Sequence, residues 1–380
     1  MTALRWIAFV VGLTIVVVSW RSIIYTLVVP RRTETPFPFV VFRYVRMCFD
    51  AVARRMDSYE ARDHLLALMG PVAFLAFLLV WLILFVVGYA FILLPFGDIS
   101  IGEALFESGS STFTLGIAAH KAWAPAIVYF SAAATGLGVV ALLVGYLPTL
   151  YGAFNRRETL VTTLQSRAGA PAWGPEILAR HQLVGLVGAL PDLYADWERW
   201  AADVAETHSN YPILTAFRSP HPLRSWVVAL LAVMDAAALH LALCPDSAPP
   251  QARLCLRMGF VCMRELCATL GIPFDPDPDP HDPIGLSYEE FVGGVERLEH
   301  AGFQLERPLE EAWPHFRGWR VNYEAMVYEM ADQVMAPPGP WSGSRSKLPD
   351  VTFVPQRPVD RRPGDPGHDL PKTSPPEWKV

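Results

Sequence analysis

The residues with the most suggestive chemistry lie together between two long apolar stretches, in the segment 110–118. This segment reads Ser-Ser-Thr-Phe-Thr-Leu-Gly-Ile-Ala, so four of its nine residues carry hydroxyl groups. Backbone that is not helical is tolerated at membrane depth only where protein buries it or a watery cavity lines it. A short helix followed by a Thr-x-Gly stretch between two apolar segments is the layout of a pore loop.

The short helix that precedes this segment is predicted over Ile101–Phe113. Ser100 is placed to cap its first turn, and Glu103 stands at the third helical position, which is the spacing of a capping box. Residues 97–122 are too few to cross a membrane and return, and too apolar for a simple exposed loop. The sequence therefore predicts a half-helix that ends between two spans.

Three apolar segments are long enough to cross a membrane, since a helix needs ~20 apolar residues to cover the ~30 Å hydrocarbon core. They are Trp6–Val29, Leu65–Phe96 and Trp123–Phe154. The second is longer than required. Either Gly70-Pro71 breaks it and the membrane part begins near Val72, or it is one tilted, continuous helix.

The stretch 65–154 resembles the span–pore helix–filter–span unit of potassium-type cation channels. The residues 112–116 look like the Thr-x-Thr-Val-Gly that opens the potassium filter, and 104–106 resemble the start of that family's pore helix. In that family, filter carbonyls and the lowest threonine hydroxyl replace the hydration shell of the ion. The resemblance implies a tetramer that conducts monovalent cations, with K+ in the pore and no other cofactor. It gives the carbonyl roles to residues 114–117, within a selectivity filter formed by Thr112, Thr114, Leu115, Gly116, Ile117 and Ala118.

A second hypothesis stays open beside the channel. Ala118 stands where the family usually has a second glycine, which favours a non-conducting membrane receptor or scaffold whose helical domain binds a partner. An enzyme is not expected, because the chain has no Gly-rich phosphate loop and no GxSxG, HExxH or paired-carboxylate motif. The net charge of −6 argues against a nucleic-acid partner.

Small residues in the third span are expected to shape the pore. Gly138 and Gly145 fall where channels of this type bend the inner helix, and Pro148 is a candidate kink near the inner mouth. Two pairs four residues apart permit close helix packing, namely Ala132 with Gly136 and Ala134 with Gly138. Ordinary packing glycines are the alternative interpretation.

The basic residues predict the orientation in the plasma (inner) membrane. Seven arginines follow the first span, whereas the segment 97–122 contains only Lys121 as a basic residue. Cytosolic loops carry the excess of Lys and Arg. The prediction therefore places residues 30–64 and everything after 155 in the cytosol. The seven arginines are Arg31, Arg32, Arg43, Arg46, Arg54, Arg55 and Arg62.

The first of these cytosolic segments is itself amphipathic. Apolar residues recur at helical spacing, and three arginines lie off their stripe. Such a helix lies either on the inner leaflet, where anionic lipids attract arginine, or against the protein itself. The stripe is Phe42, Val45, Phe49, Val52 and Met56; the arginines predicted to face the membrane surface are Arg43, Arg46 and Arg54.

The remainder of the chain is predicted to be a helical domain followed by a Pro-rich, disordered tail. The predicted class is all-α, with a re-entrant pore helix among the membrane helices. Trp226–Leu243 is interpreted as a core helix rather than a span, because it carries Asp235 and His240. Both side chains, whose role the sequence leaves open, are interpreted as satisfied core groups. The expected divisions are 1–29, 30–64, 65–155, 156–336 and 337–380.

Five cysteines occur, and none forms a CxxC pair. All five are interpreted as reduced, buried cytosolic thiols, and no metal site is expected from the last four. Other helical stretches of this half are Ile177–Val204, Leu223–Leu243, Ala252–Leu270, Tyr288–His300 and Leu309–Val334.

Overall fold

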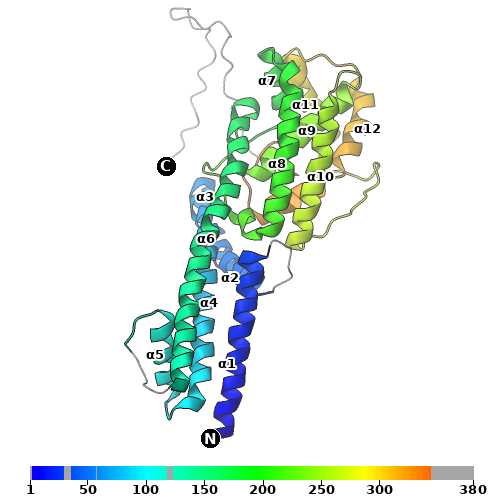
Figure 1. The fold of residues 1–380 in the computed structure, drawn as a ribbon. Helices are drawn as coiled ribbons and strands as arrows, with labels where there is room; N and C mark the ends of the chain where they lie inside the picture. The colour runs from blue at the N-terminus through cyan, green and yellow to red at the C-terminus, as the bar shows by residue number, and fades with distance from the viewer. Residues whose placement is uncertain (1, 30–35, 57, 118–122, 344–380) are drawn as a thin grey trace, which may run out of the picture. The chain divides into compact units, whose positions relative to one another are not determined.

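The computed structural model describes residues 2–29, 36–56, 58–117 and 123–343 (Figure 1). Within these ranges every regular element is a helix and no strand occurs. The chain divides into two compact units. The first contains Met1–Phe154 with Asn210–Arg218, and the second contains Asn155–Ser209 with Ser219–Val380. Residues 344–380, which make up most of the expected Pro-rich tail, and residues 118–122 lie outside the described residues.

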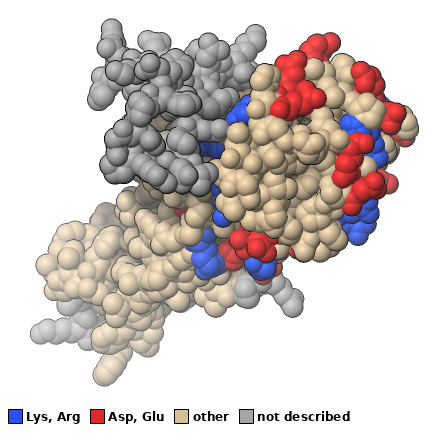
Figure 2. Space-filling model, turned by 90° about the horizontal axis from the view of Figure 1, so that it is seen from above, with Lys and Arg blue, Asp and Glu red and all other residues tan. Residues whose placement is uncertain are grey.

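Four helical stretches among the described residues are long and apolar enough to cross a membrane: Ala3–Val28, Tyr59–Phe96, Pro125–Ala168 and Trp226–Leu243. Figure 2 shows acidic and basic side chains gathered over one part of the surface, while another part is almost entirely uncharged. Large exposed apolar side chains are concentrated in the first unit; among the described residues, only Val184, Leu186, Leu254 and Val261 of the second unit are in this class. The composition and surface fit a multi-pass membrane protein.

The first unit is a set of helices around one apolar cluster. Its elements are α1 (Thr2–Ile23), a π-helical turn (Ile24–Val28), α2 (Pro36–Ala53), α3 (Tyr59–Ala67), α4 (Met69–Leu93), 3-10 turns at Leu94–Phe96 and Pro212–Ala216, α5 (Ile101–Thr112) and the part of α6 (Trp123–Ala168) that ends at Phe154.

Glycines allow α1 and α4 to approach closely. A Cβ added to Gly12 would lie 2.5 Å from the carbonyl oxygen of Gly88, so neither position has room for a larger residue. The indole N–H of Trp81 on α4 donates to the Ser22 hydroxyl on α1 at 3.3 Å. At the other end of α1, Arg5 donates to the carbonyl oxygen of Gly97 at 2.6 Å. These contacts pair the two helices along their length.

The second apolar stretch is two helices rather than one. The break falls at Leu68, which lies between α3 and α4 and makes a turn. Pro71 explains the position, because it has no N–H to donate to the carbonyl of Ala67 and its ring crowds that carbonyl. The interruption expected at Gly70-Pro71 is therefore present, displaced by two residues toward the N-terminus.

Residues 210–218 belong to the first unit although the surrounding chain belongs to the second. The Arg218 Nε donates to a carboxylate oxygen of Asp63 on α3 at 2.5 Å, and both side chains are buried. The ring of Phe217 covers Gly70 so closely that a Cβ there would lie 2.7 Å from it. The sequence gives no signal for this return of the chain.

The second unit is built around α9 (Trp226–Leu243), whose apolar window is entirely buried inside protein. No face of α9 is left for lipid, which agrees with its interpretation as a core helix. It contacts α7, α10, α12 and α13. The helices of this unit besides α9 are α7 (Gly174–Leu183), α8 (Leu190–Asn210, of which Asn210 belongs to the first unit), α10 (Pro250–Leu270), α11 (Tyr288–His300), α12 (Leu309–Arg320) and α13 (Glu324–Gln333).

Two of the helical stretches in this half are each two helices. Ile177–Val204 is divided after Leu183, where Gly185 takes a φ of 68° that glycine adopts without steric cost. Leu309–Val334 is divided after Arg320. The packed unit also extends past Pro337, the expected start of the tail, because Trp341 is buried and Ser342 hydrogen-bonds Gly339.

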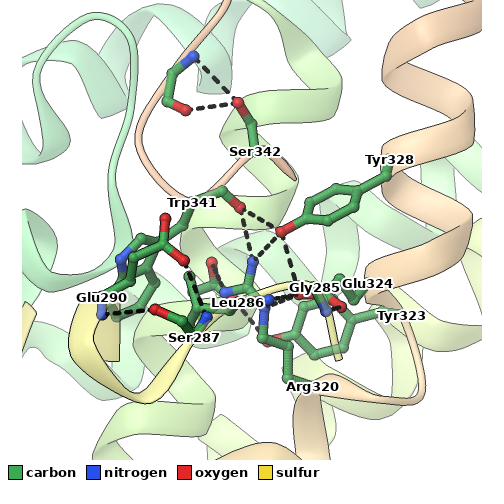
Figure 3. A network of polar contacts seen from close by, with 12 residues as sticks. Gly285, Leu286, Ser287, Glu290, Arg320, Tyr323, Glu324, Tyr328, Trp341 and Ser342 are labelled. Carbon is green, nitrogen blue, oxygen red and sulfur yellow. Dashed lines mark hydrogen bonds and ion pairs between the residues drawn. The ribbon is translucent and has the colours of Figure 1, made fainter. Parts of the chain in front are cut away.

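A buried polar network holds the core of the second unit (Figure 3). Arg320 is fully buried and forms ion pairs with Asp235 at 2.7 Å and with Glu324 at 2.9 Å. It also donates to the carbonyl oxygen of Trp341 at 2.7 Å. Asp235 additionally accepts from the Tyr323 hydroxyl at 2.7 Å. Asp235 is therefore a satisfied core group, as its sequence context indicates.

The carboxylate of Glu324 extends the network to the loop before α11. Its two oxygens accept backbone N–H groups from Gly285 and Leu286, the second at 3.0 Å. His240 has a partner of its own, since its Nδ1 lies 3.3 Å from the Tyr194 hydroxyl. The four cysteines of this unit, Cys244, Cys255, Cys262 and Cys267, are free and buried.

A buried histidine makes the stability of the second unit depend on pH. His208 on α8 is fully buried, and its Nε2 lies 3.0 Å from a guanidinium nitrogen of Arg157. Since arginine only donates, Nε2 accepts and the ring is neutral; its Nδ1 lies 3.0 Å from the Thr207 hydroxyl. Burial, with the Arg157 charge adding to it, holds the pKa of His208 well below its usual value. Glu158, paired with Arg157 at 2.8 Å, is the nearest acidic partner of this cluster.

We therefore expect the second unit to lose stability in acid. The unfolded state binds a proton near pH ~6.5 and the folded state does not, so stability is present above that pH and falls below it. From this residue the loss between pH ~6.5 and ~5.5 is about 1 kcal/mol. The measurement is the urea midpoint at which the buried thiols of the full chain become reactive, with labelling normalised to a free thiol at each pH. His208→Gln should flatten the slope, and an unchanged slope would contradict the assignment.

Candidate functional site

The segment 100–117 is positioned by α4, α5 and α6 of the first unit. Ser100 caps α5 by accepting from the Glu103 N–H at 3.2 Å, and the Glu103 carboxylate accepts from the Ser100 N–H at 2.7 Å. The predicted capping box is therefore confirmed. The 12 residues of α5 rise about 18 Å, which is too short to cross a membrane.

Contacts along α4 and α6 show how far α5 reaches beside them. The Ser108 hydroxyl donates to the Val86 carbonyl oxygen at 2.7 Å, and Val86 lies about 10 Å from the end of α4. The last residue of α5, Thr112, meets Gly136, which lies about 20 Å from the start of α6. The second half of α5 therefore lies beside interior turns of α4 and α6, about 10 Å from the end of α4 and about 20 Å from the start of α6.

Gly136 is what allows this approach. A Cβ built on it would lie 1.9 Å from the Thr112 carbonyl oxygen, which is a backbone atom that no side-chain movement can remove. Of the small residues predicted to pack, Gly136 and Ala132 are buried, whereas Ala134 is exposed. The close packing expected of this face is thus directed at the end of α5.

The chain turns sharply after α5. Thr114 has a φ of 55° and Gly116 a φ of 68°, so two of the three residues 114–116 are left-handed. The Thr114 N–H donates to the Ser111 carbonyl at 2.9 Å and the Leu115 N–H to the Ser110 carbonyl at 2.8 Å. These two bonds form a Schellman cap, which usually has glycine where this chain has Thr114.

A β-branched residue in the left-handed region is an outlier that costs of order 1–3 kcal/mol. Such strain persists only where surroundings impose it, and it clusters at functional sites. The side chain of Ser110 helps to impose it by accepting from the Ile117 N–H at 3.1 Å. Leu115 and Ile117 have exposed side chains, 61% and 63%. Ala118 lies outside the described residues.

The turn contains a run of backbone carbonyl oxygens that lack a hydrogen-bond donor in the described part of the chain. No donor among the described residues bonds these carbonyl oxygens, although the N–H groups of Phe113, Thr114, Leu115 and Ile117 all donate. In hydrocarbon each unsatisfied carbonyl costs several kcal/mol. At membrane depth these oxygens would need water, a cation or another chain as a partner. The residues are Phe113, Thr114, Leu115 and Gly116; the Thr112 oxygen also lacks such a donor, but it is packed against Gly136 of α6.

Polar side chains behind the turn are buried against α4 and α6. The Tyr129 hydroxyl donates to the Glu107 carboxylate at 2.7 Å, and the hydroxyls of Tyr89 and Thr135 lie 2.7 Å apart. Glu107 is 8% exposed and Thr112 is 2% exposed. The Thr112 hydroxyl has no partner among the described residues. The Glu107–Tyr129 bond joins α5 to α6, and the Tyr89–Thr135 contact joins α4 to α6.

Sequence reasoning missed Glu107 and Tyr129 as members of this site. A carboxylate within the predicted half-helix Ile101–Phe113 was the available signal, because ionisable groups at membrane depth are rare and mostly functional. No cluster of three or more potential metal-ligating side chains occurs among the described residues.

The other predicted site residues lie apart from the turn. A Cβ on Gly138 would meet Trp20 of α1 at 3.5 Å, an ordinary contact, and a Cβ on Gly145 would meet nothing within 4 Å. Helix α6 continues through both glycines and Pro148. On α2, Arg43 is exposed, whereas Arg46 is half-buried beside Asp50.

Comparison with known proteins adds no relative. No family model matches the chain, and neither the curated proteins nor the solved structures contain a match.

Proposed function

We propose that this protein is a channel of the potassium type that conducts monovalent cations through an assembly of several copies. The observation that carries the proposal is the run of four carbonyl oxygens, residues 113–116, that accept no hydrogen bond from the described residues and follow the end of α5 between α4 and α6. Carbonyl rings replace the hydration shell of an ion in channels of this type. The left-handed Thr114 and Gly116 are the local backbone geometry that frees these oxygens from helical bonding.

The proposal implies a topology. Helices α1, α4 and α6 cross the membrane, and α5 enters it without crossing. The arginines after α1, together with Arg156 and Arg157, then put α2, α3 and the second unit in the cytosol, while the N-terminus and residues 97–122 lie outside. Arg5 and Asp98, paired at 2.7 Å, both belong to the outer end in this arrangement.

The outward face of α6 supports assembly. Its exposed residues recur at helical spacing and are apolar or small, which suits contact with other copies or with lipid. They include Ile127, Phe130, Ala134, Leu137, Ala141 and Val144. Four chains would close the ring that a carbonyl filter needs, and the second unit would regulate or assemble them.

Flux measurements on purified protein in liposomes test the proposal. Wild-type protein should carry K+ and Na+ above empty vesicles. Gly116→Ala should lower the flux at least about tenfold, because a left-handed conformation costs an L-residue roughly 1–2 kcal/mol and the turn must change. Gly293→Ala is the matched control, since a Cβ on this α11 glycine meets nothing within 4 Å. It should leave flux unchanged.

Ala118→Gly tests the assignment of the filter further. If residue 118 occupies the position of the second filter glycine, the change should raise the K+/Na+ flux ratio. An unchanged ratio in a conducting protein would count against the assignment. Absence of flux from folded, inserted protein would sink the channel proposal and leave the non-conducting receptor.

A further inference from the structure

Helix α2 has an inward face that the first unit already uses. Val41, Phe42 and Val45 pack against the apolar cluster of that unit, and Phe49 is half-buried. The helix contacts α3 and α4. Most of the apolar stripe visible in the sequence is therefore occupied by protein.

The opposite face of α2 is also apolar, and nothing described covers it. Tyr44 is 65% exposed, Met47 is 55% exposed and Val40 is 45% exposed. Val40, Tyr44 and Met47 stand at i, i+4 and i+7 and so share one face of the helix. Isolated exposed apolar residues are ordinary, but a row of three on one helix face marks a contact surface.

Basic side chains border this row. Arg43 lies on the edge of the exposed face, and Arg54 and Arg55 follow directly after the end of α2; all three are exposed. None forms an ion pair with a carboxylate of the described residues. Arg46 differs, because it is half-buried and lies 3.6 Å from Asp50 one turn on.

We propose that this face of α2, defined by Val40, Tyr44 and Met47 with Arg43, Arg54 and Arg55, docks on the anionic phospholipid headgroups of the membrane that the first unit crosses. An apolar row flanked by arginines fits a helix lying at the headgroup level, where the row enters the acyl boundary and the arginines meet phosphates. The positive charge of the border complements an anionic lipid surface and disfavours a basic or neutral one.

The position of α2 in the chain favours lipid over a soluble protein as the partner of this face. Only seven residues separate the end of the first span-length helix at Val28 from the start of α2 at Pro36. Figure 1 shows α2 at the end of α1 that is opposite the N-terminus. If α1 crosses the membrane, α2 is held at its surface. This inference rests on the membrane crossing in the proposed function but not on ion conduction.

Cys48 provides the reporter for the test. It is exposed on α2, one turn from Tyr44, whereas the other four cysteines are buried. Full-length protein labelled at Cys48 with an environment-sensitive fluorophore is placed in vesicles of phosphatidylcholine, with or without phosphatidylglycerol. Quenching by lipids that carry a nitroxide at the headgroup, and by aqueous iodide, is then measured.

We expect headgroup quenching to increase and iodide quenching to decrease when phosphatidylglycerol is present. Each of Arg43→Gln, Arg54→Gln and Arg55→Gln should lower the ratio of docked to released helix about fivefold in anionic vesicles. Arg46→Gln is the matched control and should leave the ratio unchanged, because Arg46 is turned toward Asp50.

Three outcomes overturn the proposal. The first is equal quenching of the label by iodide with and without anionic lipid. The second is an effect of Arg46→Gln as large as that of Arg43→Gln. The third is a label shielded from both quenchers until the protein is diluted among vesicles, which would identify a second copy as the occupant.

A separate label at Leu79→Cys, in a Cys48→Ser chain, tests whether α4 crosses the membrane. Leu79 is exposed on α4, so it should be quenched by nitroxide deep in the acyl chains. If it is not, the membrane crossing fails independently of α2.

Discussion

Replacing Gly136 by alanine should displace the end of α5 and destabilise the first unit by about 1–3 kcal/mol. The added Cβ would start 1.9 Å from the Thr112 carbonyl oxygen, and real Cβ contacts are not found under 3.0 Å. The two helices must therefore separate by about 1 Å or more at this point. The turn 113–117 follows directly from that end of α5 and would move with it, so we also expect the K+ and Na+ flux to be lost.

Hydrogen exchange and thermal unfolding of the full chain in detergent measure the effect. The amides of Thr114 and Leu115, which are bonded to α5, should exchange faster in the variant, and the unfolding midpoint should fall. Gly145→Ala is the matched control on the same helix. Its Cβ would meet nothing within 4 Å, and alanine in a helix interior gains up to about 1 kcal/mol over glycine.

A second comparison locates the clash. The Thr112 atom in conflict is the backbone oxygen, so Thr112→Ala should not rescue Gly136→Ala. A rescue would show that side-chain crowding, rather than the backbone approach, sets the position of α5. Equal behaviour of Gly136→Ala and Gly145→Ala would contradict the packing of α5 on α6.

Replacing Arg320 by methionine should destabilise the second unit by roughly 3–5 kcal/mol. The loss of the guanidinium leaves two buried carboxylates, on Asp235 and Glu324, with no cation between them. It also leaves the Trp341 carbonyl oxygen without the Arg320 donor, although the Tyr328 hydroxyl still donates to it at 3.0 Å. The penalty arises mainly from uncompensated buried charge rather than from lost packing.

The rate at which buried cysteines react with a thiol label reports this loss of stability. Cys255 and Cys262 are fully buried on α10, and Phe260 of the same helix stacks on Tyr323 with ring centroids 5.8 Å apart. In a Cys48→Ser chain, thiol labelling of α10 reports only on opening of the second unit. Its rate should rise about 100-fold or more in Arg320→Met, since 1.4 kcal/mol is a factor of ten.

Arg199→Met is the matched control. Arg199 pairs with Asp196 at 2.5 Å on the surface, where both side chains are largely exposed. Exposed pairs of this kind contribute little, so the labelling rate should stay close to wild type. If Arg320→Met labels no faster than Arg199→Met, the buried network does not support the unit as argued.

Signals that act within one or two turns were sufficient to predict much of the first unit. Apolar length alone indicates the helices α1, α4 and α6, because a bilayer or a core is the only place for such surfaces. The capping box at Ser100 and Glu103 predicts the start of α5, since its two hydrogen bonds join residues three apart. The break before α4 follows from Pro71 in the same local way.

The same rules left open which face of α2 the protein covers. The stripe through Phe42 and Val45 was visible, but both faces of the helix carry apolar residues. Only packing against α4 shows which one is occupied. Arg46 was grouped with Arg43 by spacing, whereas the folded chain places it beside Asp50.

Membrane-compatible helices, their order and the position of the Thr-x-Gly turn were thus determined by the sequence itself, because each depends on neighbouring residues. Only the tertiary structure decided that Gly136 meets Thr112, that Arg218 returns to Asp63 and that Arg320 joins Asp235 to Glu324. The first two contacts join residues 24 and 155 positions apart, and the third joins α9 to the junction of α12 and α13. Such pairings depend on how whole helices approach one another, and no periodicity within a single helix encodes that approach.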